Sequence, residues 1–124
     1  AQAAASELRR RKACIVNLVD IYAERPNPGH PVYSMAKAAN AMMVKSLALD
    51  LAPDVRVNGV SPGAALWPEG YLADADKQEI LERIPMRRPA GAEQIAEAVM
   101  FMVTGPDYIT WQILAVDGGR SVQQ

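Results

Sequence analysis

One short run of apolar residues constrains the fold of this chain more than any other feature. Residues 13–19 are apolar at nearly every position, without polar alternation. Such a run is typical of a strand covered on both faces, as in a parallel sheet. Residues 55–60 and 113–116 are predicted as a second and a third strand. Helical segments separate the three, so the chain is expected to form an α/β fold with a doubly wound sheet.

The segments between the strands carry the spacing and the end signals of helices. Residues 1–12 are rich in helix formers and end in a basic cluster, which suits the negative end of a helix dipole. In residues 32–51, apolar and small side chains recur at helical spacing, and Pro53 ends the segment. Two further helices are expected at about 75–84 and 92–103.

Length and composition limit the partners of the chain. Its 124 residues, half of them apolar, suffice for one small domain with a core and are too few for two. Thirteen basic and fourteen acidic residues give a formal charge of -1, which provides no electrostatic reason to bind nucleic acid or an anionic membrane. No apolar stretch approaches the roughly 20 residues that span a bilayer. We therefore expect a small-molecule substrate.

The single cysteine bears on the compartment. Cys14 lies inside the first apolar run, which favours a buried, unreactive thiol, and one cysteine cannot form an internal disulfide. The basic residues 9–12 follow small residues rather than precede an apolar core, so no export signal is visible. These features predict a cytoplasmic protein. No metal site is predicted, and His30 is interpreted as a solvated loop residue.

A tyrosine and a lysine are the first candidates for chemistry. Tyr33 and Lys37 are four residues apart near the start of a predicted helix, so their side chains share one face. A neighbouring cation favours the phenolate, which should lower the tyrosine pKa from near 10 and let the hydroxyl act as a general acid. Spacing alone also fits an ordinary helix surface. In doubly wound sheets, however, ligands bind at the carboxyl ends of the strands, and this helix follows such an end.

The surrounding segments resemble the C-terminal half of the short-chain dehydrogenase/reductase family. The resemblance covers essentially the whole chain and rests on residues 33–37 (YSMAK), 56–63 (RVNGVSPG) and 116–119 (VDGG). It implies the C-terminal half of a Rossmann-type sheet, an oxidoreductase that uses a nicotinamide cofactor, and Tyr33 and Lys37 as its catalytic pair. Family members use the helix at 32–51 in dimer contacts, so a homo-oligomer, either a dimer or a homotetramer, is expected.

Asp20 indicates which group within the family the chain resembles most. The family usually has a serine about thirteen residues before the tyrosine, whereas residues 16–20 here read VNLVD, similar to the pteridine reductases. A carboxyl group can relay a proton or bind an amino-pterin edge when a ring C=N bond is reduced. The resemblance thus implies NADPH-dependent reduction of pterins or dihydrofolates, with Tyr33 as proton donor and Asp20 at the pterin. Because Lys37 would keep Asp20 ionised, service as an acid requires burial or a shared proton.

Residues after the second strand are expected to contact cofactor and substrate. The resemblance places Pro62, Gly63 and Ala65 along the nicotinamide, together with Tyr33 and Lys37. The family's usual threonine is missing from residues 64–68, which read AALWP. An apolar wall for an aromatic substrate is expected there, although Trp67 could equally pack in the core. The expected substrate-binding residues are Asp20, Tyr33, Leu66, Trp67 and Pro68.

Two further features depart from the family pattern. No glycine-rich turn that could cradle a dinucleotide pyrophosphate occurs in the 124 residues. We therefore expect residues 1–124 to be the C-terminal part of a single domain whose cofactor half lies upstream, where the choice between NADP and NAD is made. Trp111 stands where the family has glycine, and its side chain is expected to crowd its neighbours. Residues 117–119 are interpreted as a structural turn, with Arg120 solvated.

Two alternatives remain open at the level of sequence. The first is another short-chain reductase that acts on a carbonyl substrate, in which Asp20 is incidental. The second is a non-catalytic fragment or subunit that serves assembly. Retention of Tyr33 and Lys37 argues against the second alternative, and the missing glycine-rich turn argues for it.

Overall fold

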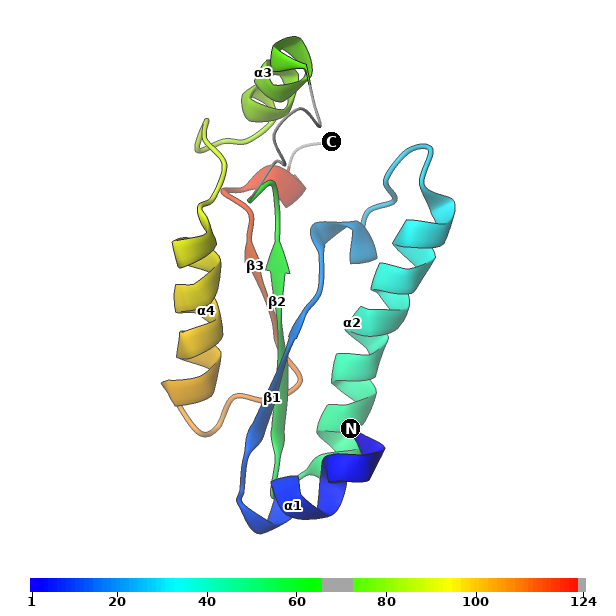
Figure 1. Cartoon of the computed structure of the whole chain (residues 1–124), viewed down its shortest axis with the longest axis vertical. Helices are drawn as coiled ribbons and strands as arrows, with labels where there is room; N and C mark the ends of the chain where they lie inside the picture. Colours follow the sequence, from blue (N-terminus) through cyan, green and yellow to red (C-terminus); the bar gives the residue numbers. More distant parts are fainter. Residues whose placement is uncertain (66–72, 123–124) are drawn as a thin grey trace.

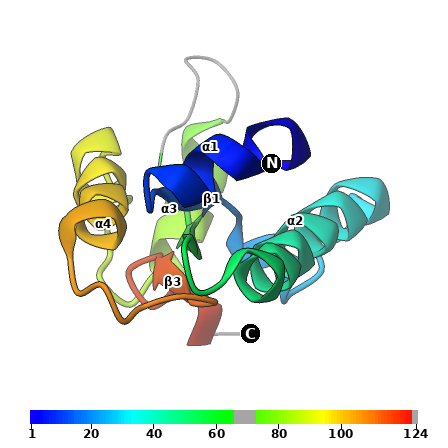
Figure 2. The ribbon, with the colours of Figure 1, turned by 90° about the horizontal axis from the view of Figure 1, so that it is seen from below.

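The computed structural model describes residues 1–65 and 73–122 and has a parallel sheet between two layers of helices (Figure 1). Figure 2 shows α2 and α4 on opposite sides of the strands. The elements are η1 (Gln2–Ala4), α1 (Ala5–Arg10), β1 (Cys14–Leu18), η2 (Ile21–Ala23), α2 (Pro31–Leu51), β2 (Arg56–Pro62), α3 (Asp74–Glu82), α4 (Ala92–Thr104), β3 (Ile113–Val116) and η3 (Arg120–Val122).

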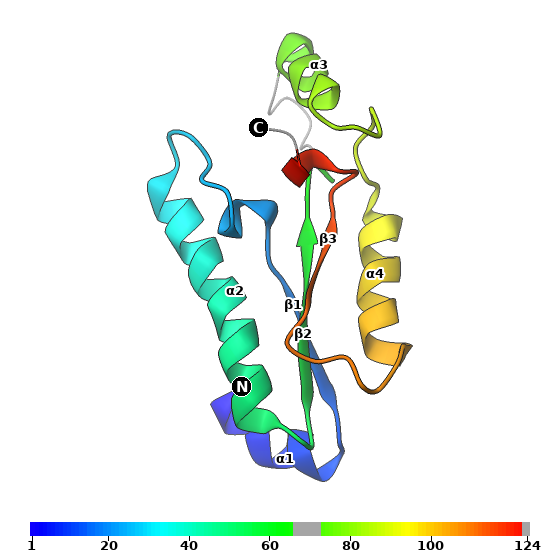
Figure 3. The same cartoon turned by 180° about the vertical axis from the view of Figure 1, so that it is seen from behind.

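The sheet has three strands within the described residues, in the order β1-β2-β3, and both pairings are parallel. Leu18 pairs with Val60 and Pro62 pairs with Val116, so the carboxyl ends of the strands meet at one edge. Figure 3 shows this arrangement from behind, with α3 and η3 beyond that edge. The predicted α/β class and parallel sense are confirmed.

The core lies between α2 and the first two strands. Its buried cluster consists of Val19, Val44, Ala48, Leu51, Val55 and Val57. Fully burying a side chain of this size stabilises the fold by about 1.5–3 kcal/mol. The central strand β2 is buried along most of its length, whereas β1 has a neighbour on only one side in this structure, and Leu18 at its end is 54% exposed.

Polar side chains tie β2 to the segment that precedes β3. Asn58 is 0% exposed; its Nδ2 donates to the Ile109 carbonyl at 2.8 Å and its Oδ1 accepts from the Gln112 amide at 3.0 Å. The Arg56 guanidinium donates to the carbonyls of Met102 and Val103 at 3.0 Å, which satisfies open carbonyls at the end of α4. These contacts fix the crossover from α4 into β3.

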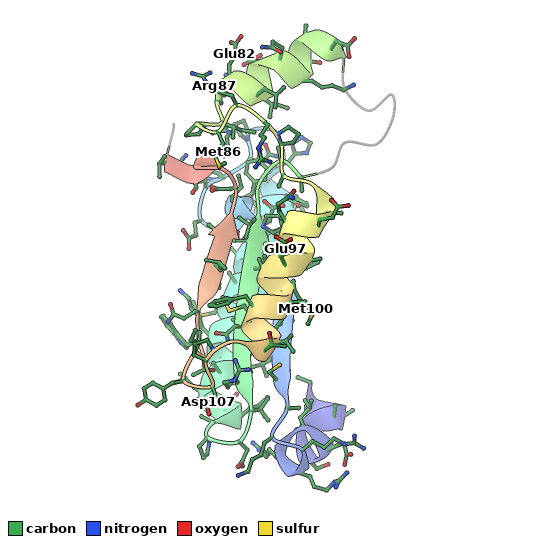
Figure 4. All side chains as sticks on the ribbon, turned by 90° about the vertical axis from the view of Figure 1, so that its left-hand side faces the viewer. Glu82, Met86, Arg87, Glu97, Met100 and Asp107 are labelled. Atoms are coloured by element: carbon green, nitrogen blue, oxygen red, sulfur yellow. The ribbon has the colours of Figure 1, made fainter. Side chains whose placement is uncertain are left out.

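The turn after α3 is closed by a side chain that returns to the helix. Arg87 has a φ of 56° and its Nη1 donates to the Glu82 carbonyl at 2.6 Å. Figure 4 shows both residues beside α3, with Met86 near the carboxyl end of β3. This turn brings the chain from α3 back to the start of α4.

Most element predictions are confirmed, with shifted bounds. The helix expected at 75–84 is α3 (Asp74–Glu82), and the regular part of residues 1–12 is shorter than expected. The prediction of a buried Cys14 was wrong: the residue is half-buried because β1 lies at the side of the described sheet. None of the helices in the described ranges is long and apolar enough to cross a bilayer.

Trp111 corrects another expectation. Its side chain does not crowd the interior but is 43% exposed, with the Lys45 ammonium 4.6 Å from the ring centroid. The demanding feature is the backbone, because Trp111 has a φ of 69°. A left-handed conformation costs a residue with a Cβ roughly 1–2 kcal/mol. The glycine that the family has at this position would avoid that cost.

Candidate active site

The candidate site begins where β1 ends, at a residue that caps a short helix. Asp20 has extended backbone angles, and its Oδ1 accepts from the Tyr22 amide at 2.9 Å. This bond satisfies an open amide at the start of η2 and fixes the carboxylate. One oxygen of Asp20 is thus held by the main chain, and the other is directed elsewhere.

The second oxygen of Asp20 meets the predicted catalytic tyrosine. The Tyr33 hydroxyl donates to Asp20 Oδ2 at 2.6 Å, a distance typical of a hydrogen bond to a charged oxygen. Tyr33 lies in the first turns of α2, after the loop that follows η2, and its side chain is 42% exposed. The structure therefore joins two residues that are thirteen positions apart in the chain.

Lys37 completes the predicted cluster one helical turn further on. Its Nζ donates to the Val19 carbonyl at 3.4 Å and lies 5.6 Å from the centroid of the Tyr33 ring. The ammonium therefore lies beside the end of β1 and over the tyrosine ring. Asp20, Tyr33 and Lys37, which we call the site cluster, lie together at the carboxyl end of the sheet.

The charge environment of Tyr33 is opposite to the expected one. Burial raises the pKa of Tyr33 to about 12, helped by the hydrogen bond to Asp20 and by the negative charge of that carboxylate. The expectation that Lys37 lowers this pKa was wrong for this structure, because the carboxylate is at hydrogen-bond distance and the ammonium contacts the ring. At neutral pH the hydroxyl keeps its proton, as a proton donor must.

The residues expected to line a cofactor lie at the end of β2. Pro62 is the last residue of the strand, and the Gly63 amide donates to the Val116 carbonyl at 3.1 Å. A Cβ on Gly63 would lie 2.7 Å from Asp117 Cβ, so the approach of β2 and β3 requires glycine. Ala65 is described and half-exposed. The predicted substrate wall, Leu66, Trp67 and Pro68, lies outside the described residues.

The predicted turn after β3 is present in the structure. Gly118 and Gly119 have φ values of 61° and 85°, which suit glycine. Burial alone would raise the pKa of Asp117, but hydrogen bonds from Ser121 and Gly119 outweigh it and lower that pKa. Arg120 was expected to be solvated, but it is half-buried and lines a cleft.

Sequence reasoning missed two sets of neighbours of the site cluster. Tyr22 meets Tyr33 edge to face, with ring centroids 6.5 Å apart and an interplanar angle of 72°. Asn40 accepts from Asn17 at 3.2 Å and donates to the Leu18 carbonyl at 3.0 Å, which holds the end of β1 against α2. The polar Asn17 inside an apolar run was the one signal that pointed to this second contact.

A cleft of about 880 Å³ lies beside η2 and α3. Its size is within the range of small-molecule pockets. Among the described residues, no group of three or more histidine, cysteine, aspartate or glutamate side chains could hold a metal ion. The cleft is lined by Ile21, Tyr22, Arg25, Pro26, Asn27, Pro28, Asp76, Glu79, Ile80, Arg83 and Arg120.

The parallel sheet and the site cluster at its carboxyl edge define a Rossmann-like α/β protein. A family model described as enoyl-(acyl carrier protein) reductase matches residues 1–121. The solved structure of an apo SCOR enzyme from Clostridium thermocellum superposes with a TM-score of 0.86 at 29% identity, over 99% of this chain and 48% of that one. The chain belongs to the short-chain dehydrogenase/reductase family.

The chain is similar in sequence to several curated proteins, three of which follow. It is 40% identical to the uncharacterized oxidoreductase YmfI of Bacillus subtilis over 90% of its length, and 35% identical to pteridine reductase 1 of Leishmania tarentolae over 94%. It is 32% identical to the 3-oxoacyl-(acyl-carrier-protein) reductase FabG of Thermotoga maritima over 90%. The chain spans 48%, 41% and 47% of these relatives, which is less than half of each.

Proposed function

We propose that the protein that carries this chain reduces pterins or dihydrofolates with NADPH. The observation that supports this best is the 2.6 Å hydrogen bond between the Tyr33 hydroxyl and Asp20 Oδ2. A serine at position 20 would be the ordinary family residue, whereas an aspartate can cap η2 with Oδ1 and still offer the charged acceptor Oδ2 to an amino-pterin edge. The similarity to pteridine reductase 1 supports the same substrate class.

The proposed reaction adds two hydrogens to a ring C=N bond. NADPH, held by Tyr33, Lys37, Pro62 and Gly63, would supply the hydride for the ring carbon and would be left as NADP+. Tyr33 supplies the proton for the ring nitrogen and is left as a phenolate. Because the pKa of Tyr33 is raised to about 12, the hydroxyl is protonated before the reaction. Lys37 offers a positive charge beside the phenolate that forms. Asp20 exchanges its bond to Tyr33 for one to the pterin, so that the hydroxyl is free to reach the substrate.

The residues at the strand ends offer chemical groups that suit a nicotinamide cofactor. An ammonium and a hydroxyl on one helix face, Lys37 and Tyr33, suit the hydroxyls of a ribose. Pro62, Gly63 and Ala65 offer a backbone edge to a flat ring, since Gly63 has no side chain. The pyrophosphate requires a glycine-rich turn, which we propose lies in an upstream half of the same domain.

A second candidate function is reduction of a carbonyl on another small substrate. The similarity to the 3-oxoacyl-(acyl-carrier-protein) reductase FabG favours it. In this reading, Tyr33 and Lys37 act as above, and Asp20 serves only to cap η2 through its bond to the Tyr22 amide.

The exposed surface of α2 suggests how the protein assembles. We propose a homo-oligomer, either a dimer or a tetramer, in the cytoplasm. The α2 helix carries exposed apolar side chains at Met35, Met42, Met43 and Leu49, which a second copy would cover.

Replacement of Asp20 by serine in the full protein separates the two candidates. Asp20→Ser keeps a capping oxygen and removes the carboxylate. We expect kcat/KM for dihydrobiopterin to fall at least tenfold, while turnover of a simple diketone is retained or rises. Steady-state kinetics on both substrates give the answer. An equal fall on both, or no change on either, would support the carbonyl reductase instead.

A further inference from the structure

Tyr22 borders both the site cluster and the cleft. Its ring meets the Tyr33 ring edge to face at 6.5 Å, and its amide holds Asp20 Oδ1 at 2.9 Å. The same residue lines the 880 Å³ cleft, together with residues of α3. Tyr22 thus contacts the Tyr33 ring and also lines a cavity large enough for a substrate.

The walls of the cleft combine charged side chains with apolar ones that offer surface to a flat ring. Ile21, Pro26 and Ile80 contribute apolar surface beside the Tyr22 ring. The charged residues have both signs, and Arg83 is paired with Glu79 on the same helix. The three arginines and two carboxylates of the lining offset one another in part. Aromatic contact with Tyr22 is therefore one source of selectivity in the cleft.

We propose that Tyr22 is a specificity-determining residue, against whose ring a planar aromatic substrate packs while its reacting bond faces the Tyr33 hydroxyl. The inference rests on the proposed reductase function and extends it, because it predicts a preference for planar rings whether or not they carry the amino edge of a pterin. A tyrosine ring suits this role, since it gives a large contact area and loses little conformational entropy.

The test compares two dicarbonyl substrates in the full protein with NADPH. Phenanthrenequinone is planar and aromatic, whereas butanedione is small and aliphatic, and neither has a pterin edge. Tyr22→Leu removes the aromatic ring, and Tyr22→Phe is the matched control that keeps it. We expect Tyr22→Leu to raise KM for the quinone about three- to tenfold with kcat nearly unchanged, and to leave butanedione kinetics unaltered. Tyr22→Phe should keep the wild-type KM for the quinone.

Binding measurements keep this inference separate from the reductase proposal. The dissociation constant of the quinone, measured by fluorescence titration, should weaken in Tyr22→Leu by the same three- to tenfold even where turnover is absent. Absence of turnover on every substrate would count against the proposed function alone. An unchanged quinone affinity, an equal loss for both substrates, or an equal loss in Tyr22→Phe would overturn the role of Tyr22.

Discussion

Two groups of polar side chains, one at the end of β1 and one along β2, use hydrogen bonds for different purposes. Asn58 on β2 is 0% exposed, and its side chain bonds only to main-chain groups of the fold, the Ile109 carbonyl and the Gln112 amide. Tyr33 at the site cluster is 42% exposed, and its hydroxyl bonds to a carboxylate, which is also accessible to an incoming ligand. Saturated bonds of the first kind fix the fold, whereas exchangeable bonds of the second kind are available for chemistry.

The largest expected effect is on kcat and comes from the site cluster at the end of β1. Tyr33→Phe in the full protein removes the proton donor, and we expect kcat to fall on the order of a hundredfold or more. The free energy of unfolding should fall by only about 1 kcal/mol, because the lost hydrogen bond is partly exposed. Steady-state kinetics and urea denaturation measure the two quantities.

A double variant sharpens the assignment of the catalytic pair. Lys37→Ala should act on the same proton as Tyr33→Phe, so their combined effect on kcat should be far smaller than the product of the two. Fully multiplicative losses would show that the two side chains act independently. Activity within tenfold of wild type in Tyr33→Phe would remove the tyrosine from the mechanism.

The next largest effect is on the free energy of unfolding and comes from the buried polar group on β2. Asn58→Ala leaves the Gln112 amide without its acceptor and leaves the Ile109 carbonyl with only the Arg56 guanidinium, which should lower the free energy of unfolding by about 2 kcal/mol. Asn40→Ala is the matched control, because Asn40 is half-buried and its loss should cost about 1 kcal/mol or less. Equal losses in urea denaturation would contradict the division between the two groups.

The smallest effect concerns backbone strain next to β3. Alanine and glycine at position 111 both remove the ring over which Lys45 lies, but only glycine adopts a φ of 69° without cost. Trp111→Gly should therefore be more stable than Trp111→Ala by about 1 kcal/mol, the reverse of the usual order. An alanine variant as stable as the glycine variant would show that the left-handed backbone at this position carries no strain.

Much of the fold could be predicted because its signals are local. The apolar run before Asp20, the spacing of small and apolar residues along α2 and the proline after it each depend on neighbouring residues alone. Burial at the sides of the sheet could not be predicted in this way, since it depends on how many strands pair with β1. For this reason Cys14 and Leu18 are more exposed than an unbroken apolar run indicates.

The site was predictable in its members but not in its electrostatics. Asp20, Tyr33 and Lys37 could be named from the resemblance to the family, and the structure brings them together. The direction in which the Lys37 ammonium points is set by the Val19 carbonyl, which no spacing rule includes. Tyr22 was missed because an aromatic residue two positions after a strand end is unremarkable until its ring is placed against Tyr33.

The central claim is that Asp20 and Tyr33 form one hydrogen-bonded pair that holds the proton on the phenol. Burial and Asp20 raise the pKa of Tyr33 to about 12, whereas an unfolded tyrosine titrates near 10. Between these two values the unfolded chain loses this proton and the folded chain keeps it, so the contribution of Tyr33 to stability is present below about pH 10 and is lost as the pH rises toward 12.

The most direct measurement is an NMR titration of ¹³Cζ-labelled tyrosine, with the Tyr33 signal assigned by its loss in Tyr33→Phe. In the wild-type protein Tyr33 should remain largely protonated at about pH 11, which is above the ordinary tyrosine pKa of about 10. Asp20→Asn keeps a capping side chain but removes the charge, so the Tyr33 pKa should fall toward 10. A Tyr33 signal that titrates near 10 in the folded wild-type protein, or one that Asp20→Asn leaves unchanged, would contradict the pair.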